Sequence, residues 1–224
     1  MKLTADKGYA RLKAEGKAGW GGHESDYDLF KLNIESSLVR SKAPKNGRVL
    51  ELGCGAGNLT LWMAQKGYEM FGVDITPTAI EWAKEKNAVA EFKADFQLGD
   101  ITDLNSYGDE SFDIVIDAHC LHWIYGEDRK KAYNSIFRIL RKGGFYFQYS
   151  QCDEPNIEKA QEKGLTYDPS RRVFINKCGV IGAYYGTHES ILSEVRGIGL
   201  EIISWALIHE ADGDEICIEA KKPA

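Results

Sequence analysis

The stretch Asp117–Trp123 reads Asp-Ala-His-Cys-Leu-His-Trp and places four side chains capable of acid-base chemistry or metal binding within six residues. The first candidate for catalysis is His119, because an imidazole titrates near neutral pH and could remove a proton from an attacking hydroxyl, amine or thiol. A packed or an exposed histidine explains His119 equally well. For His122, the second candidate, we favour a structural role in which the ring is hydrogen-bonded to backbone and holds the loop.

A metal site in the same region is a competing interpretation, because His119, Cys120, His122 and the distant Cys152 carry ligand atoms. Metal-binding histidine pairs on helices usually stand four residues apart. A His-Cys-x-His run at a strand-loop junction points adjacent side chains in different directions and preforms no tetrahedral set. We therefore expect no metal.

Three glycines at alternate positions, Gly53, Gly55 and Gly57, form the second distinctive pattern. They follow a short apolar strand, Arg48–Leu52, and precede a helix-forming segment, so a backbone turn must approach something where a side chain would collide. We interpret this turn as the binding site of a nucleoside-bearing cofactor. A glycine turn without such a ligand, as in any α/β protein, is the simpler alternative.

The glycine spacing disfavours a nicotinamide dinucleotide. The dinucleotide fingerprint needs a small residue three positions after its second glycine, where this sequence has Asn58, while Gly57 comes one position too early. Glu51 stands at the mouth of the turn, where it would repel a pyrophosphate but not a cationic amino-acid cofactor.

An acidic residue follows at the place where nucleotide folds bind ribose. Asp74 ends the second predicted strand, Tyr68–Asp74, a little short of the ~20-residue offset at which a carboxylate meets adenosine ribose hydroxyls. A carboxylate there can accept hydrogen bonds from both hydroxyls. An acidic turn residue that touches no ligand is the alternative.

Alternating strands and helices must position these residues. The predicted fold is a doubly wound α/β sheet of seven strands, mostly parallel, with an antiparallel last strand. Its strands are Arg48–Leu52, Tyr68–Asp74, one within Phe92–Asp100, Ser111–Asp117, one ending near Tyr149, Leu200–His209 and Glu215–Lys221, with a hairpin signal at Asp212-Gly213-Asp214. Its helices are Asp26–Arg40, one from the glycine turn to Gly67, Pro77–Lys86, Glu127–Arg141 and His188–Val195.

The Glu-x-Gly-x-Gly-x-Gly run at Glu51–Gly57 resembles the first motif of the class I S-adenosylmethionine-dependent methyltransferases. Leu121-His122 matches a pair common in that family, and Leu140–Phe147 is similar to its Leu-Lys-Pro-Gly-Gly junction, with Lys142 in place of proline. The resemblance implies that Asp100 accepts a hydrogen bond from the adenine amino group and that Ile101 packs beside the base. The cofactor-binding residues expected from motif and resemblance together are Glu51, Gly53, Cys54, Gly55, Gly57, Asp74, Ile75, Asp100, Ile101 and Asp117.

Two segments lie outside these motifs. Residues 1–24, which include Gly19-Trp20-Gly21-Gly22-His23, are expected to be a mobile lid or a disordered leader, with Trp20 as a candidate substrate contact. Residues 151–185 lack periodicity and form an insertion before the sixth strand, where we expect substrate recognition. Arg171 and Arg172 could bind a substrate carboxylate there, although solvated surface arginines are commoner.

Composition narrows the class of partner. The 224 residues suit one domain, and the net charge of −6 is spread without a basic block, which disfavours nucleic acid. Five cysteines without a Cys-x-x-Cys pair suit a reducing cytoplasm. No signal peptide or membrane span is expected, so the predicted protein is soluble and cytoplasmic.

We therefore predict an S-adenosylmethionine-dependent methyltransferase that acts on a small molecule by direct in-line transfer. The sequence after the fourth strand lacks the Asn/Asp-Pro-Pro-Tyr/Phe motif, which disfavours the methyltransferases of base and amide nitrogens. Two alternatives stay open: a nicotinamide-dependent oxidoreductase, and a module that binds S-adenosylmethionine or S-adenosylhomocysteine without turnover.

Overall fold

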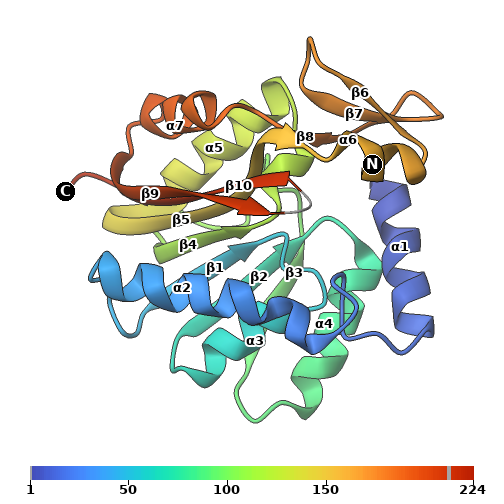
Figure 1. Cartoon of the computed structure of the whole chain (residues 1–224). Coiled ribbons are helices and arrows are strands. Elements are labelled where there is room, and N and C mark those ends of the chain that lie inside the picture. Colours follow the sequence, from blue (N-terminus) through green and yellow to red (C-terminus); the bar gives the residue numbers. More distant parts are fainter. Residues whose placement is uncertain (1, 211–212) are drawn as a thin grey trace.

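The computed structural model describes residues 2–210 and 213–224. Its main sheet has seven strands in the order β3-β2-β1-β4-β5-β10-β9 (Figure 1). Strand β10 pairs antiparallel with both β5 and β9, whereas the pairings among β1 to β5 are parallel. The predicted doubly wound sheet with one antiparallel last strand is confirmed. Asp212, at the expected hairpin turn, lies outside the described residues.

The main-sheet strands are β1 Arg48–Leu52, β2 Glu69–Asp74, β3 Ala94–Leu98, β4 Phe112–Ala118, β5 Leu140–Pro155, β9 Glu201–Glu210 and β10 Gly213–Lys221. The helices are α1 Lys2–Ala14, α2 Asp28–Arg40, α3 Asn58–Gln65, α4 Pro77–Val89, α5 Glu127–Ile139, α6 Ile157–Glu162 and α7 His188–Gly197. There are also two 3-10 turns in the described chain, η1 Glu24–Tyr27 and η2 Leu121–Trp123. Three further strands are short: β6 Leu165–Asp168, β7 Val173–Asn176 and β8 Ile181–Tyr184.

Helices cover both faces of the sheet. Successive strand residues face opposite sides, so Leu50 and Val115 join the core cluster that includes α5 and α7, whereas Val49 and Ile114 join the cluster that includes α2 and α3. Figure 1 shows α5 and α7 on one face and α2, α3 and α4 on the other. Because β1, β2 and β4 are parallel, the turns that follow them meet at one edge of the sheet, which is where such folds bind ligands.

Three parts of the chain differ from the sequence-based expectation. Residues Lys2–Ala14, expected to be mobile or disordered, form α1, because their Ala-, Lys- and Leu-rich composition favours helix and Tyr9 is buried against α4. The insertion, expected to be irregular, contains α6 and the antiparallel sheet β6-β7-β8, whose strands of four residues are too short for a clear periodic pattern. Helix α5 ends at Ile139, two residues earlier than expected, and β5 begins at once.

Among residues 2–210 and 213–224, no helix combines the length and the apolar character needed to cross a membrane.

Candidate cofactor and acceptor site

The glycine turn is confined by residues from two other parts of the chain. Gly53, Gly55 and Gly57 have φ angles of 64°, 52° and 78°, a left-handed conformation that residues with a side chain rarely adopt. A Cβ atom on Gly53 would lie 2.6 Å from Sγ of Cys120, and one on Gly55 would lie 2.5 Å from the hydroxyl of Tyr9. Both the backbone conformation and the space around it therefore require glycine.

The carboxylate of Asp74 is bonded to this turn. It is buried, and its Oδ2 accepts a hydrogen bond from the backbone N–H of Gly55 at 3.0 Å. Its Oδ1 accepts from the backbone N–H and the hydroxyl of Thr76 at 2.8 and 2.6 Å. An ionised carboxylate has about four acceptor positions, so these three bonds leave capacity for a ligand hydroxyl. The cradle of glycines beside a carboxylate fits a nucleoside.

Glu51 lies beneath the turn and not at its open mouth. Its side chain is buried, and Oε2 accepts a hydrogen bond from the hydroxyl of Thr60. Burial raises the pKa of Glu51 to about 8, and the nearby negative charge of Asp74 adds to the effect. At neutral pH the carboxyl group is therefore mainly protonated, and a cationic group placed beside it would favour its ionised form.

The residues expected around adenine follow β2 and β3 at the same edge. Ile75 is half-buried directly after β2. Asp100 is exposed, and its Oδ1 accepts from the backbone N–H and the hydroxyl of Thr102 at 2.9 and 2.8 Å, while Ile101 is buried in the core. The second carboxylate oxygen of Asp100 makes no bond within the described chain and is open to a donor.

Asp117 braces the loop after β4. It is fully buried, and its Oδ1 accepts hydrogen bonds from the backbone N–H groups of Cys120 and Leu121 at 2.7 and 3.1 Å. Its Oδ2 has no hydrogen-bond partner among the described residues. Burial raises the pKa of Asp117 to about 6, and the two backbone bonds oppose that shift.

Both candidate histidines lie at this loop. His119 has a left-handed backbone conformation with φ of 67°, and its Nε2 lies 2.7 Å from Oε1 of Glu215, without the alignment of a hydrogen bond. His122 is buried, and its ring lies edge-on to that of His119 with centroids 5.0 Å apart. Burial, then the nearby His119 and Arg129, lower the pKa of His122 well below its usual value, so His122 is neutral near pH 7. Its Nδ1 finds no partner in the described part of the chain, in contrast to the backbone bond that we expected.

Glu215 is the site residue that sequence reasoning missed. It lies in the last strand, β10, and belongs to no motif. A signal was nevertheless available: because β10 was expected to be antiparallel, its first residues had to lie at the edge where the parallel strands end.

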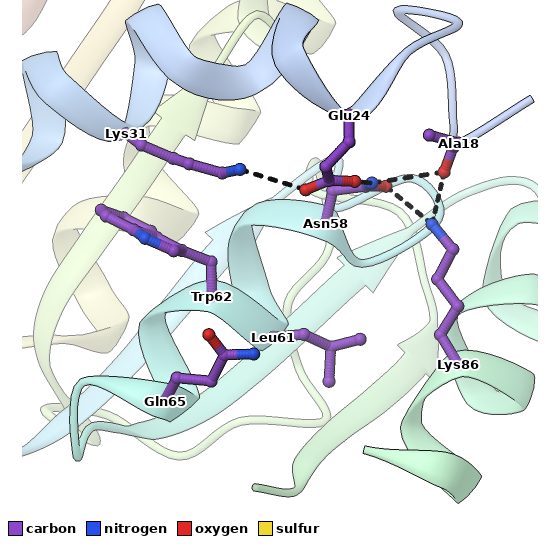
Figure 2. A pocket seen from close by; sticks show the side chains of 8 residues that line it. All are labelled: Ala18, Glu24, Lys31, Asn58, Leu61, Trp62, Gln65 and Lys86. Atoms are coloured by element: carbon purple, nitrogen blue, oxygen red, sulfur yellow. Dashed lines mark hydrogen bonds and ion pairs between the residues drawn. The ribbon is translucent and has the colours of Figure 1, made fainter. Parts of the chain in front are cut away.

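The N-terminal segment is fastened to the helix that follows the glycine turn (Figure 2). The amide of Asn58 donates to the carboxylate of Glu24 at 2.7 Å and to the carbonyl of Ala18 at 3.2 Å. Lys86 of α4 donates to Oδ1 of Asn58 at 2.9 Å, and burial lowers its pKa to about 8. A cavity of about 260 Å³ lies beside this group, lined by Ala18, Glu24, Lys31, Asn58, Leu61, Trp62, Gln65 and Lys86.

Helix α1 lies against the same region. Asp6 accepts a hydrogen bond from the backbone N–H of Thr78 at 2.9 Å, near the start of α4. The rings of Tyr9 and Trp20 are 5.0 Å apart, and Trp20 is about half exposed. Residues 2–27 thus cover the glycine turn on one side.

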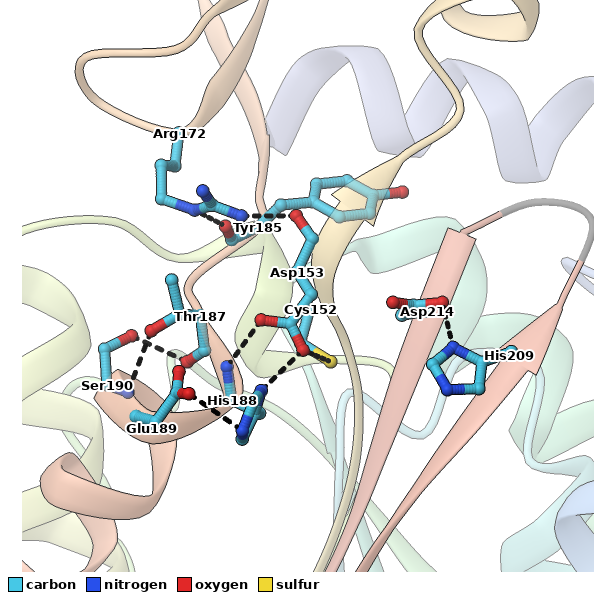
Figure 3. A network of polar contacts seen from close by, with 10 residues as sticks. All are labelled: Cys152, Asp153, Arg172, Tyr185, Thr187, His188, Glu189, Ser190, His209 and Asp214. Carbon is cyan, nitrogen blue, oxygen red and sulfur yellow. Dashed lines mark hydrogen bonds and ion pairs between the residues drawn. The ribbon is translucent and has the colours of Figure 1, made fainter.

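The two arginines of the insertion have different surroundings. Arg172 donates to the backbone carbonyls of Tyr185 and Asp153, which ties β7 and β8 to the end of β5 (Figure 3). Arg171 is exposed and its guanidinium lies over the ring of Tyr125, 5.3 Å from the centroid. Arg171 is therefore the arginine of the pair that is available to a ligand.

A further polar group joins the insertion to α7. Asp153, His188 and Glu189 bring their ligand atoms within 4.8 Å of one another. Nδ1 of His188 lies 2.8 Å from Asp153 and Nε2 lies 3.0 Å from Glu189, so each ring nitrogen faces a different carboxylate (Figure 3). This geometry is that of a histidine between two acidic partners.

Comparisons with known proteins match the part of the chain that contains the glycine turn. A family model described as "Methyltransferase domain" matches residues 50–148. The chain is 27% identical to phosphoethanolamine N-methyltransferase 1 of Zea mays over 76% of its own length and 32% of the maize protein. It is 30% identical to a 2-heptyl-1-hydroxyquinolin-4(1H)-one methyltransferase of Mycobacteroides abscessus over 65% of this chain and 61% of that protein. The chain carries a class I S-adenosylmethionine-dependent methyltransferase domain.

A solved structure has the same fold. It is a 1,6-didemethyltoxoflavin N1-methyltransferase of Burkholderia thailandensis, in complex with 1,6-didemethyltoxoflavin and S-adenosylhomocysteine. The TM-score is 0.65 at 18% sequence identity, over 86% of this chain and 78% of that one.

The matched span divides the methyltransferase domain into two halves. Residues 50–148 contain the glycine turn, Asp74, Asp100 and His119. Helix α1, the insertion and β10 with Glu215 lie outside it. The candidate cofactor residues Asp74 and Asp100 thus lie within the matched span.

Removal of the Asp74 carboxylate should weaken cofactor binding. Each charge-assisted bond to a ribose hydroxyl is worth on the order of 1.5–3 kcal/mol, so Asp74→Ala should reduce affinity for S-adenosylhomocysteine at least tenfold in calorimetry. Thr76→Val is the matched control, because it removes one donor to Asp74 and leaves the carboxylate in place. Equal affinities of the wild type and Asp74→Ala would exclude Asp74 from the site.

The buried Glu51 should make stability depend on pH. Its pKa in the folded state is raised from 4.5 to about 8, so the folded protein holds a proton that the unfolded chain loses, and stability falls as pH rises through this window. Relative to the wild type, Glu51→Gln should therefore gain free energy of unfolding between about pH 4.5 and pH 8. Denaturant titrations at several pH values measure this difference. A constant difference across the range would contradict it.

Proposed function

We propose that this chain transfers the methyl group of S-adenosylmethionine to a small-molecule acceptor. The observation that carries the proposal is the glycine turn, with three left-handed glycines and the Asp74 carboxylate bonded to its backbone. Such a cradle lets a nucleoside approach the backbone, and the glycine spacing disfavours a dinucleotide.

The groups of this chain divide the work of binding. Asp74 accepts a hydrogen bond from a ribose hydroxyl, and Asp100 accepts one from the adenine amino group. Glu51 lies where the cationic amino group of the methionine portion would favour its ionised form. The bound cofactor supplies a methyl group made electrophilic by the sulfonium, so the task left to the chain is to align a nucleophile and exclude water.

A small acceptor suits the surroundings of the site. The net charge of −6 disfavours a nucleic-acid backbone. The maize and mycobacterial relatives are named for small acceptors, a phosphoethanolamine and a hydroxyquinolone. Residues 1–24 would act as the lid, held by Asn58 and Glu24, and residues 151–185 would contact the acceptor, with Arg171 and Trp20 as its exposed contacts.

Two other functions make different predictions. A nicotinamide-dependent oxidoreductase would need a pyrophosphate to sit beside Glu51 and Asn58, which the spacing disfavours. A binding module without turnover would use the same cradle and differ only in the absence of methyl transfer.

Calorimetry separates these functions. S-adenosylmethionine and S-adenosylhomocysteine should bind, and NAD should not. Tritiated S-adenosylmethionine with a panel of small hydroxyl, amine and thiol compounds should then yield a labelled product. Binding of NAD without the sulfonium ligand would overturn the proposal, and cofactor binding without transfer across the panel would favour the binding module.

His119 should act on methyl transfer and not on cofactor binding. If it is the general base, His119→Ala should lower turnover by about 10²–10⁴-fold with nearly unchanged affinity for S-adenosylhomocysteine. The wild-type rate should also fall as the solution becomes acidic, because a protonated imidazole cannot accept a proton. High activity of His119→Asn with a flat pH profile would instead indicate that His119 only positions the acceptor.

A further inference from the structure

A carboxylate from the last strand faces the ring of His119. Nε2 of His119 lies 2.7 Å from Oε1 of Glu215, which is 8% exposed. Glu215 pairs with Gln151 of β5, and the backbone N–H of His119 donates to the carbonyl of Tyr149, two residues earlier on the same strand. The two residues therefore reach each other across β5, although they are far apart in sequence.

The imidazole is also held on its other sides. The ring of Phe30 lies edge-on to it with centroids 4.8 Å apart, and the neutral His122 lies edge-on at 5.0 Å. The left-handed backbone of His119 is a strained conformation for a residue with a side chain, and it persists because Asp117 binds the next two backbone N–H groups. These contacts fix the direction of the ring.

The two ring nitrogens have different surroundings. Nε2 is buried and faces the carboxylate, whereas the side chain as a whole is 25% exposed. No hydrogen bond from the described residues reaches Nδ1. A carboxylate beside one imidazole nitrogen favours the tautomer that carries the proton there. Nδ1 is then left as the nitrogen with a free lone pair.

We propose that Glu215 is a positioning residue that holds His119 as the Nε2–H tautomer, so that Nδ1 takes the proton of the acceptor. The acceptor is then a compound whose reacting atom carries a proton: a hydroxyl, a thiol or an amine with an N–H. This proposal rests on the methyl transfer proposed above.

The lone pair of the acceptor atom forms a bond to the methyl carbon, and the sulfur–carbon bond breaks with its electron pair left on sulfur. The acceptor proton passes to Nδ1 of His119. The resulting imidazolium is stabilised by the adjacent carboxylate of Glu215, as a charge beside an opposite charge in a partly buried site. The products are the methylated acceptor and S-adenosylhomocysteine.

Nitrogen NMR of the protein labelled with ¹⁵N-histidine tests the tautomer without any acceptor. The His119 signals are those that disappear in His119→Asn. The wild type should show the Nε2–H tautomer, and Glu215→Leu should show a mixture of both tautomers. Glu215→Gln should keep the Nε2–H form, because its amide oxygen can take the place of Oε1 beside Nε2. An Nδ1–H tautomer in the wild type, or an unchanged spectrum in Glu215→Leu, would overturn the proposal.

Asp214→Asn is the matched control. Asp214 is the neighbouring acidic residue on β10, and its carboxylate pairs with the exposed His209 at 2.8 Å (Figure 3). Its neutralisation should leave the His119 signals unchanged. Circular dichroism and binding of S-adenosylhomocysteine establish that each variant is folded.

Kinetics separate this proposal from the proposed function. With any acceptor from the panel above, Glu215→Leu should lower kcat about 10²-fold while KM for S-adenosylmethionine changes less than twofold, and Glu215→Gln should recover part of the loss. A wild type that binds no cofactor would defeat the proposed function. If Glu215→Leu transfers methyl groups as fast as the wild type, only the assignment of Glu215 is wrong.

Discussion

The hydrogen bond from the backbone N–H of Gly55 to Asp74 is the contact on which the candidate site depends. It joins the turn after β1 to the end of β2, so one interaction positions both the backbone and the carboxylate that we propose to bind the cofactor. The second oxygen of Asp74 binds Thr76 and so fixes the start of α4. These bonds matter because a buried carboxylate without hydrogen-bond partners would cost the folded state free energy. The geometry of the cradle thus follows from satisfying a single buried charge.

The same logic explains the loop after β4. Asp117 is fully buried and satisfies one oxygen with two backbone N–H groups, which turns the chain sharply enough for His119 to adopt a left-handed conformation. Arg129 binds the carbonyl of Leu121 at 2.6 Å from the opposite side and holds η2 in place. Rigid support of this kind is what a reacting side chain needs, since small errors of position cost large factors in rate. Among the residues that the structure describes, three buried polar atoms at this loop have no hydrogen-bond partner: Oδ2 of Asp117, Nε2 of His119 and Nδ1 of His122.

The order of strands and helices was largely predictable, because most main-sheet strands are rich in apolar residues and several connecting turns carry glycine or proline. The boundary of α5 and the small sheet of the insertion were not, since β6, β7 and β8 are too short for periodicity to identify them. Helix α1 was missed because its character depends on a tertiary contact, the burial of Tyr9 over the glycine turn. Within the site, the placement of Glu51 beneath the turn and its bond to Thr60 could not be deduced from the sequence motif. The motif gives the positions of residues along the chain and does not show which side chains are buried.

The antiparallel last strand explains how a residue far from His119 in sequence can lie at the proposed acceptor side. In a purely parallel sheet, only strand ends could supply residues to the ligand edge. Because β10 runs the other way, its first residues reach that edge, and Glu215 meets His119 across β5. The proposed cofactor side is fixed by the backbone of one β-α-β unit and tolerates little change. The start of β10 and the insertion lie outside that unit, so we expect changes there to alter the proposed acceptor side while the cradle stays intact.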